Sequence, residues 1–408
     1  MKITKIMVVS VFIVAFFATQ AIKSAYHSNA RGTPCSTNLQ AALTLITEIE
    51  NQLANQVSCA ATPISQADID AGAGIYTITK PGNYCLTENV TGSIMINASN
   101  VSFDLNSFNI TVESAIPLSG IVINGDYVSV QNGTLTGETE FSSSLSCTDF
   151  SLNRFCISVC NHNYLRFSDL SINNIPATYG FGIDITDCNS VIIERVTLYQ
   201  NATALAVSGS TDIFIVDSIF DGNYEYSSIV NNNRVLISGC QFTNGVYGPG
   251  LVCSGLTDLV LVDSHALFNG ACGCACDGST PSGFLLNRGT TNFEIINCNA
   301  IKNYGNGFTV DDSCNDGFLG TCNALANTNG AGFSIDADSS VVIVRDCNAN
   351  ANTGFGFKSG TASVRFWDNA GVNNNSGSDD FSIASGDPVL VIGHTTFAAG
   401  YNVATVVS

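Results

Sequence analysis

The chain has 408 residues, of which 45% are hydrophobic and 12% are charged, and its formal net charge is −19. Few charges together with this much apolar material exclude an intrinsically disordered chain. Because the chain is strongly acidic, nucleic acids and other polyanions are excluded as partners unless cations bridge them.

Residues 1–25 have the pattern of a secretory signal peptide. Lys2 and Lys5 precede an apolar run over residues 6–17, small residues follow, and cleavage is expected after Ala21 or Ala25. The run is short for a membrane span, and no other candidate span follows it. We therefore expect a secreted or cell-envelope protein with no membrane span after signal removal; the alternative is a retained N-terminal anchor.

Residues 26–74 are expected to form a helical cap and linker. Between Cys35 and Cys59, apolar residues recur at helical spacing with polar residues opposite them, at Leu39, Leu43, Ile46, Leu53 and Val57. Such an amphipathic helix would act as a lid over the open strand edge of the first coil. The alternative is a short oligomerising coiled coil.

One pattern recurs three times between Phe293 and Phe357. Two alternating apolar positions precede two spacers, a Cys, a spacer and an Ala, as in residues 342–349 (VIVRDCNA). Each unit has an Asn five residues after its Cys and then reaches a Gly-Phe pair. Cys298, Cys322 and Cys347 are 24 and 25 residues apart, and a fixed period of this length indicates a solenoid.

The template extends over most of the chain when the Cys is taken as its key position. The residues three and five places before each key position are apolar, with Gly317 as the one exception. Spacings are 22–27 residues apart from 37 and 34, which place insertions at about residues 137–155 and 270–282. The twelve key positions are Asn106, Gly133, Leu170, Val196, Ser218, Cys240, Ser264, Cys298, Cys322, Cys347, Asn369 and His394.

These repeats predict an all-β fold, a right-handed parallel β-helix solenoid of about twelve coils over residues 75–408. Each unit contains short apolar alternations, which indicate strands with every second side chain buried, separated by bends that contain Gly and Asn. One coil cannot bury its own inner face, so neighbouring coils must stack. A leucine-rich repeat has a similar period, but its leucine pattern and helical half are absent from the sequence.

Equal positions of stacked coils should form continuous lines along the solenoid. We expect the key residues from Ser218 to Cys347 to share one buried line. A second line should lie at a tight bend, with side-chain amides hydrogen-bonded along the solenoid axis. Its members are the asparagines five residues after key positions, Asn201, Asn223, Asn269, Asn303, Asn327, Asn352 and Asn374.

Three segments near the start of the repeats resemble a known superfamily. Residues 78–90 (ITKPGNYCLTENV) look like the opening segment of secreted right-handed β-helix proteins of the pectin-lyase-like superfamily. Residues 101–110 (VSFDLNSFNI) and 128–135 (VSVQNGTL) are similar to that superfamily's V-x-L-D-L-N-G-x-x-I and V-x-I-x-N-G-x-I patterns. The resemblance implies the fold but no single activity, because this fold carries lyases, hydrolases, epimerases and binding proteins.

Sixteen cysteines in an exported chain would ordinarily form disulfides. Several of them instead occupy inward key positions where other coils have Ser or Val, which favours a ladder of buried free thiols. Better disulfide candidates lie near the two insertions, at Cys147, Cys156, Cys160, Cys272, Cys274 and Cys276. As thiolates, the last three could alternatively bind a soft metal such as Zn²⁺ or Cu⁺.

Four carboxylates are the weak candidates for catalysis. Asp311 and Asp336 are 25 residues apart and follow aligned apolar positions, so they should lie on adjacent coils with Asp312 and Asp338 close by. Two carboxylates held together repel, so that one pKa rises, as a glycosidase acid requires, or a cation such as Ca²⁺ binds between them. The alternative is that these residues only shape turns, where Asp is favoured.

Departures from the enzymes of the superfamily weigh against catalysis. Polygalacturonases of this fold combine an Asp-Asp pair with Gly-His-Gly and Arg-x-Lys strings, and neither string occurs here. Pectate lyases use an arginine base beside acidic Ca²⁺ ligands, whereas the arginines here are scattered and none is expected to join an acidic stack on its own face. We therefore expect an exported non-catalytic β-helix protein that binds glycans or partner surfaces along its solenoid face, with no cofactor other than Ca²⁺. The alternative is a polysaccharide lyase or glycoside hydrolase with a divergent active site.

Overall fold

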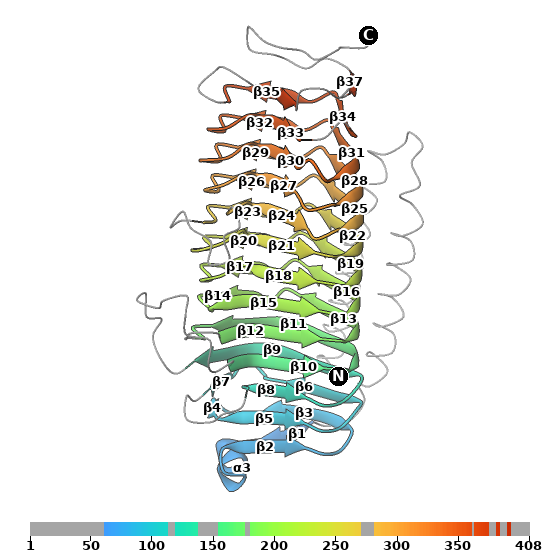
Figure 1. The fold of residues 1–408 in the computed structure, drawn as a ribbon. Coiled ribbons are helices and arrows are strands. Elements are labelled where there is room, and N and C mark those ends of the chain that lie inside the picture. The colour runs from blue at the N-terminus through green and yellow to red at the C-terminus, as the bar shows by residue number, and fades with distance from the viewer. Residues whose placement is uncertain are drawn as a thin grey trace, which may run out of the picture. The chain divides into compact units, whose positions relative to one another are not determined.

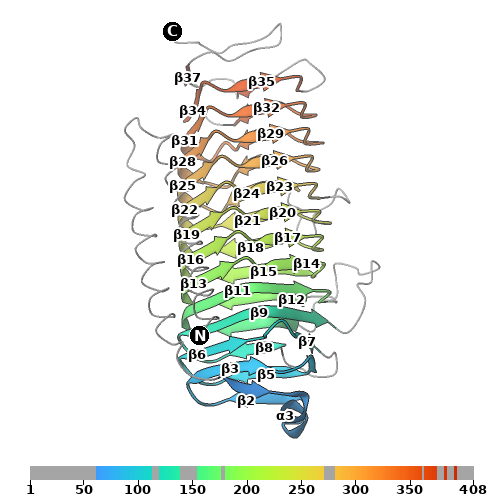
Figure 2. The same cartoon turned by 180° about the vertical axis from the view of Figure 1, so that it is seen from behind.

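A computed structural model describes residues 61–112, 119–137, 154–175, 180–270, 281–360, 363–374, 381–383 and 390–392. Within these residues, short parallel strands stack one coil above another and form a β-helix (Figures 1 and 2). The predicted signal peptide and the predicted helix between Cys35 and Cys59 lie outside the described residues. None of the helices in the described part of the chain is long and apolar enough to cross a membrane.

The strands form three faces, on each of which a strand pairs in parallel with the equivalent strand of the next coil. Face 1 consists of β1 (Thr62–Ile64), β3 (Gly82–Leu86), β6 (Val101–Asp104), β9 (Val128–Gly137), β11 (Asn163–Asn173), β13 (Asn189–Glu194), β16 (Thr211–Val216), β19 (Asn233–Ser238), β22 (Thr257–Val262), β25 (Thr291–Ile296), β28 (Asn315–Gly320), β31 (Ser340–Arg345), β34 (Val364–Trp367) and β37 (Leu390–Ile392).

Face 2 consists of β4 (Val90–Thr91), β7 (Asn109–Val112), the second halves of β9 and β11, β14 (Thr197–Tyr199), β17 (Ile219–Asp221), β20 (Gln241–Thr243), β23 (His265–Leu267), β26 (Asn299–Ile301), β29 (Asn323–Leu325), β32 (Asn348–Asn350) and β35 (Ala370–Val372). Face 3 consists of β2 (Ile75–Ile78), β5 (Ser93–Ile96), β8 (Ile121–Ile123), β10 (Arg154–Cys160), β12 (Gly180–Thr186), β15 (Thr203–Ser208), β18 (Ser227–Val230), β21 (Leu251–Ser254), β24 (Phe284–Asn287), β27 (Phe308–Val310), β30 (Phe333–Ile335), β33 (Phe357–Ser359) and β36 (Phe381–Ile383).

The prediction of an all-β parallel solenoid of about twelve coils is confirmed, since face 3 alone stacks 13 strands. The β-helix begins earlier than the expected Ile75, because β1 already pairs with β3. The single described helix, α3 (Gln66–Ala71), follows β1 at the N-terminal end of the stack and buries Ile69 (Figure 1). The template misses β1 because this edge strand buries only Ile64 and contains Pro63, which an edge strand tolerates.

The register of the strands matches the sequence template coil by coil. The residues that follow each key position pair directly with one another, for example His265 with Asn299 and Asn299 with Asn323. The key residues from Ser218 to Cys347 are all at most 1% exposed. The predicted buried line is therefore confirmed for the described residues; His394 lies outside them.

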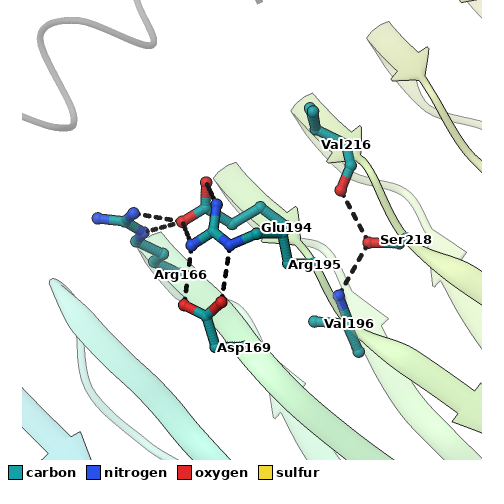
Figure 3. Close-up of polar contacts among 7 residues, drawn as sticks. All are labelled: Arg166, Asp169, Glu194, Arg195, Val196, Val216 and Ser218. Carbon is teal, nitrogen blue, oxygen red and sulfur yellow. Dashed lines mark hydrogen bonds and ion pairs between the residues drawn. The ribbon is translucent and has the colours of Figure 1, made fainter. Parts of the chain in front are cut away.

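A polar side chain is useful at the key position because the backbone turns there. Figure 3 shows Ser218, whose Oγ accepts the backbone N–H of Val196 on the preceding coil at 3.2 Å and donates to the carbonyl of Val216 at 2.9 Å. Cysteine performs the same task, since the N–H of Cys322 donates to Cys347 Sγ at 3.4 Å. Cys240, Cys298, Cys322 and Cys347 are buried free thiols, as predicted, and burial raises the pKa of Cys240 to about 12.

The predicted asparagine line is also confirmed. Asn327 Nδ2 donates to Asn352 Oδ1 at 2.8 Å and to the carbonyl of Ala300 at 3.0 Å, and Asn327 Oδ1 accepts from Asn303 Nδ2 at 3.0 Å. The same Oδ1 accepts the backbone N–H of Asn303. These fully buried amides therefore satisfy backbone groups that the bend between faces 2 and 3 leaves unpaired.

The core is filled by stacked aromatic rings on the inner side of face 3. Phe308, Phe333 and Phe357 form near-parallel pairs with ring centroids 4.9 Å apart. The glycines that precede Phe308 and Phe333 are required by close packing: a Cβ on Gly307, for example, would lie 2.6 Å from the carbonyl oxygen of Gly332 and 2.9 Å from Asn327 Nδ2. The repeated Gly-Phe pair thus serves the asparagine line and the aromatic stack together.

Candidate functional site

The acidic pair predicted at Asp311 and Asp336 is brought together on the outside of the bend after face 3. Val310 pairs with Ile335, so the aspartates that follow them lie on neighbouring coils. Burial raises the pKa of Asp311 above its usual range, and a hydrogen bond to Asp336 and the charge of that residue raise it further. The backbone N–H of Asp312 opposes this shift by donating to Asp311 Oδ1 at 2.8 Å. Such a pair can hold a proton or take a cation in its place.

The two other predicted carboxylates do not extend this pair into a metal cage. Asp312, Asp336 and Asp338 are exposed. Across the described residues, no three His, Cys, Asp or Glu side chains are placed to hold a metal ion. The Ca²⁺ site at Asp311 and Asp336 stays a prediction, and Cys272, Cys274 and Cys276 lie outside the described residues.

Two of the predicted disulfide candidates are free thiols. Cys156 is buried in the core, and burial raises the pKa of its thiol well above the usual range. Cys160 is exposed, and its sulfur accepts a hydrogen bond from Asn161 Nδ2 at 3.1 Å. The prediction is wrong for these two residues, because Cys156 packs as a small core residue and Cys160 lies at the end of β10. Cys147 lies outside the described residues.

The expectation that no arginine joins an acidic stack is wrong. Arg195 makes a bidentate contact with Asp169, Nε to Oδ1 at 2.7 Å and Nη2 to Oδ2 at 2.8 Å. Its Nη1 lies 3.2 Å from Oε2 of Glu194, whose Oε1 accepts from Nε of Arg166 at 2.8 Å (Figure 3). Asp169 and Arg195 each precede a key position, so the template itself aligns them.

This ionic cluster joins neighbouring coils, and its charged groups pair with one another rather than with a ligand. Glu194 is only 3% exposed, so its charge requires the two arginines. The hydrogen bond to Asp169 and the nearby charge of Glu194 raise the pKa of Arg195. The two carboxylates therefore favour the charged form of this guanidinium. Both arginines already pair with carboxylates, which indicates a structural contact between coils.

Asp184 is an acidic residue that the sequence reasoning missed. It lies on β12 between Ser158 and Ala206 of the neighbouring strands, and its neighbours Ile183 and Ile185 are buried in the core, so Asp184 points outward from face 3. Burial raises its pKa to about 6. No hydrogen bond or ion pair of Asp184 occurs among the described residues. No sequence signal separates it from the other aspartates, because its burial depends on the assembled fold.

Exposed apolar side chains gather on face 2 and its following bend. The described residues have six exposed large hydrophobic side chains, Tyr199, Ile219, Phe268, Tyr304, Leu325 and Val341. The first five lie on β14, β17 or β29 of face 2 or within three residues of the ends of β23 and β26; Val341 lies on face 1. Figure 1 shows these strands of face 2 one above another. Concentration of exposed apolar groups on one face is typical of an interaction surface.

The surface is most regular over β23, β26 and β29, where two lanes run along the solenoid axis. Ala266, Ala300 and Ala324 point into the core, so the residues on either side of each point outward. The amide lane consists of His265, Asn299 and Asn323, and the aliphatic lane of Leu267, Ile301 and Leu325. We call these two lanes, together with Phe268, Lys302 and Tyr304 of the adjoining bend, the strip.

Hydrogen bonds order the amide lane. Asn323 Nδ2 donates to Asn299 Oδ1 at 2.9 Å, and Asn299 Nδ2 donates to His265 Nδ1 at 2.9 Å. At the edge of the aliphatic lane, Lys302 Nζ lies 5.4 Å from the ring centroid of Phe268. The sequence template aligns the residues of both lanes, since they lie one and three residues after the key residue. How far their side chains are exposed is seen only in the structure.

The fold is similar to known right-handed β-helices. Residues 155–320 match the family model described as "Right handed beta helix region". No curated protein sequence matches this chain. The A-module of mannuronan C-5 epimerase AlgE6 from Azotobacter vinelandii is similar with a TM-score of 0.56 and 12% identity, over 86% of this chain and 99% of that one. The Dettilon tailspike protein gp208 is similar with a TM-score of 0.51 and 12% identity, over 78% of this chain and 64% of that one. At such identities these likenesses show the fold alone, and the predicted right-handed parallel β-helix is confirmed.

Proposed function

We propose that this protein is an exported, non-catalytic β-helix protein that binds a polysaccharide along the strip of face 2. The observation that carries the proposal is the pairing of an aliphatic lane, half-buried at Leu267 and Ile301 and exposed at Leu325, with an ordered amide lane on the same three coils. Sugar rings present apolar faces and hydroxyl edges, so a surface with both kinds of lane complements them. Export is part of the proposal because residues 1–25 have the pattern of a signal peptide.

The repeat of the solenoid supports a long polymer as the ligand. Neighbouring strands of a sheet lie about 4.8 Å apart, so equivalent side chains recur at that interval along the axis. Phe268 and Tyr304 are 47% and 36% exposed and add aromatic surface beside the aliphatic lane. Flat aromatic surface gives contact area at little cost in conformational entropy.

A pull-down with insoluble polysaccharides tests this proposal. The wild-type chain should be retained, and Leu325→Ser should reduce retention severalfold because it puts a polar group into the aliphatic lane. Val341→Ser is the matched control, since Val341 is 57% exposed on face 1 and should contribute nothing. Equal retention of the two variants and the parent would contradict binding at the strip, and loss of retention in both variants would point to misfolding.

A divergent lyase or hydrolase is the second candidate function. The observation that favours it is the raised pKa of Asp184 and of Asp311, since a carboxyl group that holds its proton is what a general acid requires. An assay for reducing ends and unsaturated products on each polysaccharide that binds decides between the two functions. Product formation that disappears in Asp184→Asn or Asp311→Asn would favour the enzyme.

A further inference from the structure

The hydrogen-bonding groups of the strip point to one chemical class of ligand, an inference that rests on the proposed function. We infer that the ligand is an uncharged polysaccharide. It lies along the solenoid axis with a hydroxyl edge on the amide lane and an apolar sugar face on the aliphatic lane.

The amide lane offers donors and acceptors together. Because Nδ1 of His265 accepts the N–H of Asn299, the neutral imidazole ring carries its proton on Nε2 and keeps one donor. After its two bonds within the lane, Asn299 retains one N–H and one lone pair, and Asn323 retains at least as much. A hydroxyl group both donates and accepts, whereas a carboxylate only accepts. The lane is therefore matched to hydroxyl groups.

The charge of the strip leads to the same ligand class. Residues 265–269, 299–304 and 323–327 contain no Asp or Glu, although the whole chain carries 33 acidic residues. Lys302 is the one cation within these segments. The carboxylate of Asp263, which precedes the strip, is hydrogen-bonded to Asn297 at 2.6 Å. A polyanionic ligand would be attracted by one cation on the strip and repelled by a protein with net charge −19. An uncharged polysaccharide is not repelled in this way.

The aliphatic lane fixes which side of the ligand faces the protein. Leu267, Ile301 and Leu325 are equivalent residues of three successive coils, so they form a continuous apolar line. The amide lane lies two residues away on the same strands and runs parallel to it. A polymer with one apolar and one hydroxyl-bearing side can satisfy both lanes only when it runs along the axis.

Titration of the full-length chain tests this inference. A panel of uncharged polysaccharides, namely a β-glucan, a xylan and a mannan, is compared with polygalacturonate and alginate at low and high salt. We expect at least one uncharged polymer to bind with an affinity that salt leaves unchanged, because screening acts only on charge, and we expect no binding of the two polyanions.

A charge-introducing variant locates the binding to the amide lane. Asn299→Asp removes a donor and adds a carboxylate, and we expect it to weaken binding of the uncharged polymer roughly five- to tenfold. Asn231→Asp is the matched control, since Asn231 is exposed and lies outside the strip with a backbone conformation that Asp tolerates. The control should bind like the parent.

The outcomes separate this inference from the proposed function. Preferential binding of a polyanion that weakens with salt and in Lys302→Gln would overturn the uncharged ligand and leave the binding function standing. Binding of an uncharged polymer with equal affinity by Asn299→Asp and the parent would overturn the role of the amide lane. Failure of every polymer to bind would overturn both.

Discussion

The ring of Phe293 occupies the space that a side chain at position 317 would need. The two residues pair on neighbouring coils, and a Cβ on Gly317 would lie 1.9 Å from Phe293 Cζ. Phe293 is 1% exposed. The one break in the apolar template is therefore a volume exchange, in which a large residue on one coil is compensated by glycine on the next.

Gly317→Val should destabilise the protein by about 1–3 kcal/mol, because overpacking forces the ring or the strand to move. Phe293→Val should also destabilise, through the cavity that it leaves. The double variant should recover part of the loss, since valine at both positions occurs on other coils. Urea unfolding of the four proteins measures this coupling; strictly additive losses would contradict the shared space.

Asn327→Ala should destabilise the protein by about 2 kcal/mol or more, because it leaves the buried N–H of Asn303 and the carbonyl of Ala300 without their partners. Polysaccharide binding should not change, since Asn327 points inward. Asn348→Ala is the control, because Asn348 is exposed on β32. Equal unfolding midpoints for the Asn327 variant and the parent would count against the asparagine line.

Arg195→Met should destabilise the protein by roughly 1–3 kcal/mol, because Glu194 remains buried with less compensation of its charge. The loss should be smaller than for a fully buried pair, since Arg195 has 32% of its side chain exposed. Adding Glu194→Gln to this variant should restore part of the stability. Thermal unfolding of the single and double variants checks this, and a double variant less stable than either single one would refute it.

Stability should depend on pH through Asp184. Its pKa is about 6 in the folded protein, against about 4 in an unfolded chain. Between these values the folded state binds more protons, so this residue's stabilising contribution is complete below about pH 4 and is lost as the pH rises through about 6. Asp184→Asn lacks this loss and should gain thermal stability over the parent as the pH rises from 4 to 7. A constant difference across this range would show that Asp184 is not buried as described.

Calcium should stabilise the protein weakly if it binds the acidic pair. We expect a small rise in melting temperature with Ca²⁺, because the cation would take the place of a proton between the two carboxylates. This rise should disappear in the Asp311→Asn/Asp336→Asn double variant, which lacks both carboxylate ligands. We also expect no cleavage of pectate or polygalacturonate. Unsaturated products at alkaline pH with Ca²⁺ that the double variant fails to form would overturn the non-catalytic function.

Much of the fold follows from the spacing of a few residues. Cys298, Cys322 and Cys347 set the period, and the period predicts both the buried key line and the asparagine line, because in a stacked solenoid equal sequence positions become spatial neighbours. The start at Thr62 could not be predicted in this way, since an edge strand with one buried residue carries no alternation.

The candidate sites were less accessible to sequence reasoning. Asp311 and Asp336 were placed correctly by the period alone. The period also aligns Arg195 with Asp169, because each precedes a key position, but alignment alone does not show that two long side chains meet outside the coil. Burial of Asp184 and exposure of Leu325 depend on how much of each outward-facing side chain the neighbouring coils cover after assembly. The sequence pattern does not distinguish these two residues from others at outward positions.

The most direct test is the position of a bound oligosaccharide in a crystal structure of the protein with the uncharged polymer that binds most tightly. We predict that the sugar chain lies along the axis over β23, β26 and β29, with hydroxyl groups on His265 and Asn299 and a ring face on Leu325. A sugar chain bound on face 3 beside Asp184 or Asp311 would contradict the binding strip and favour a catalytic site there.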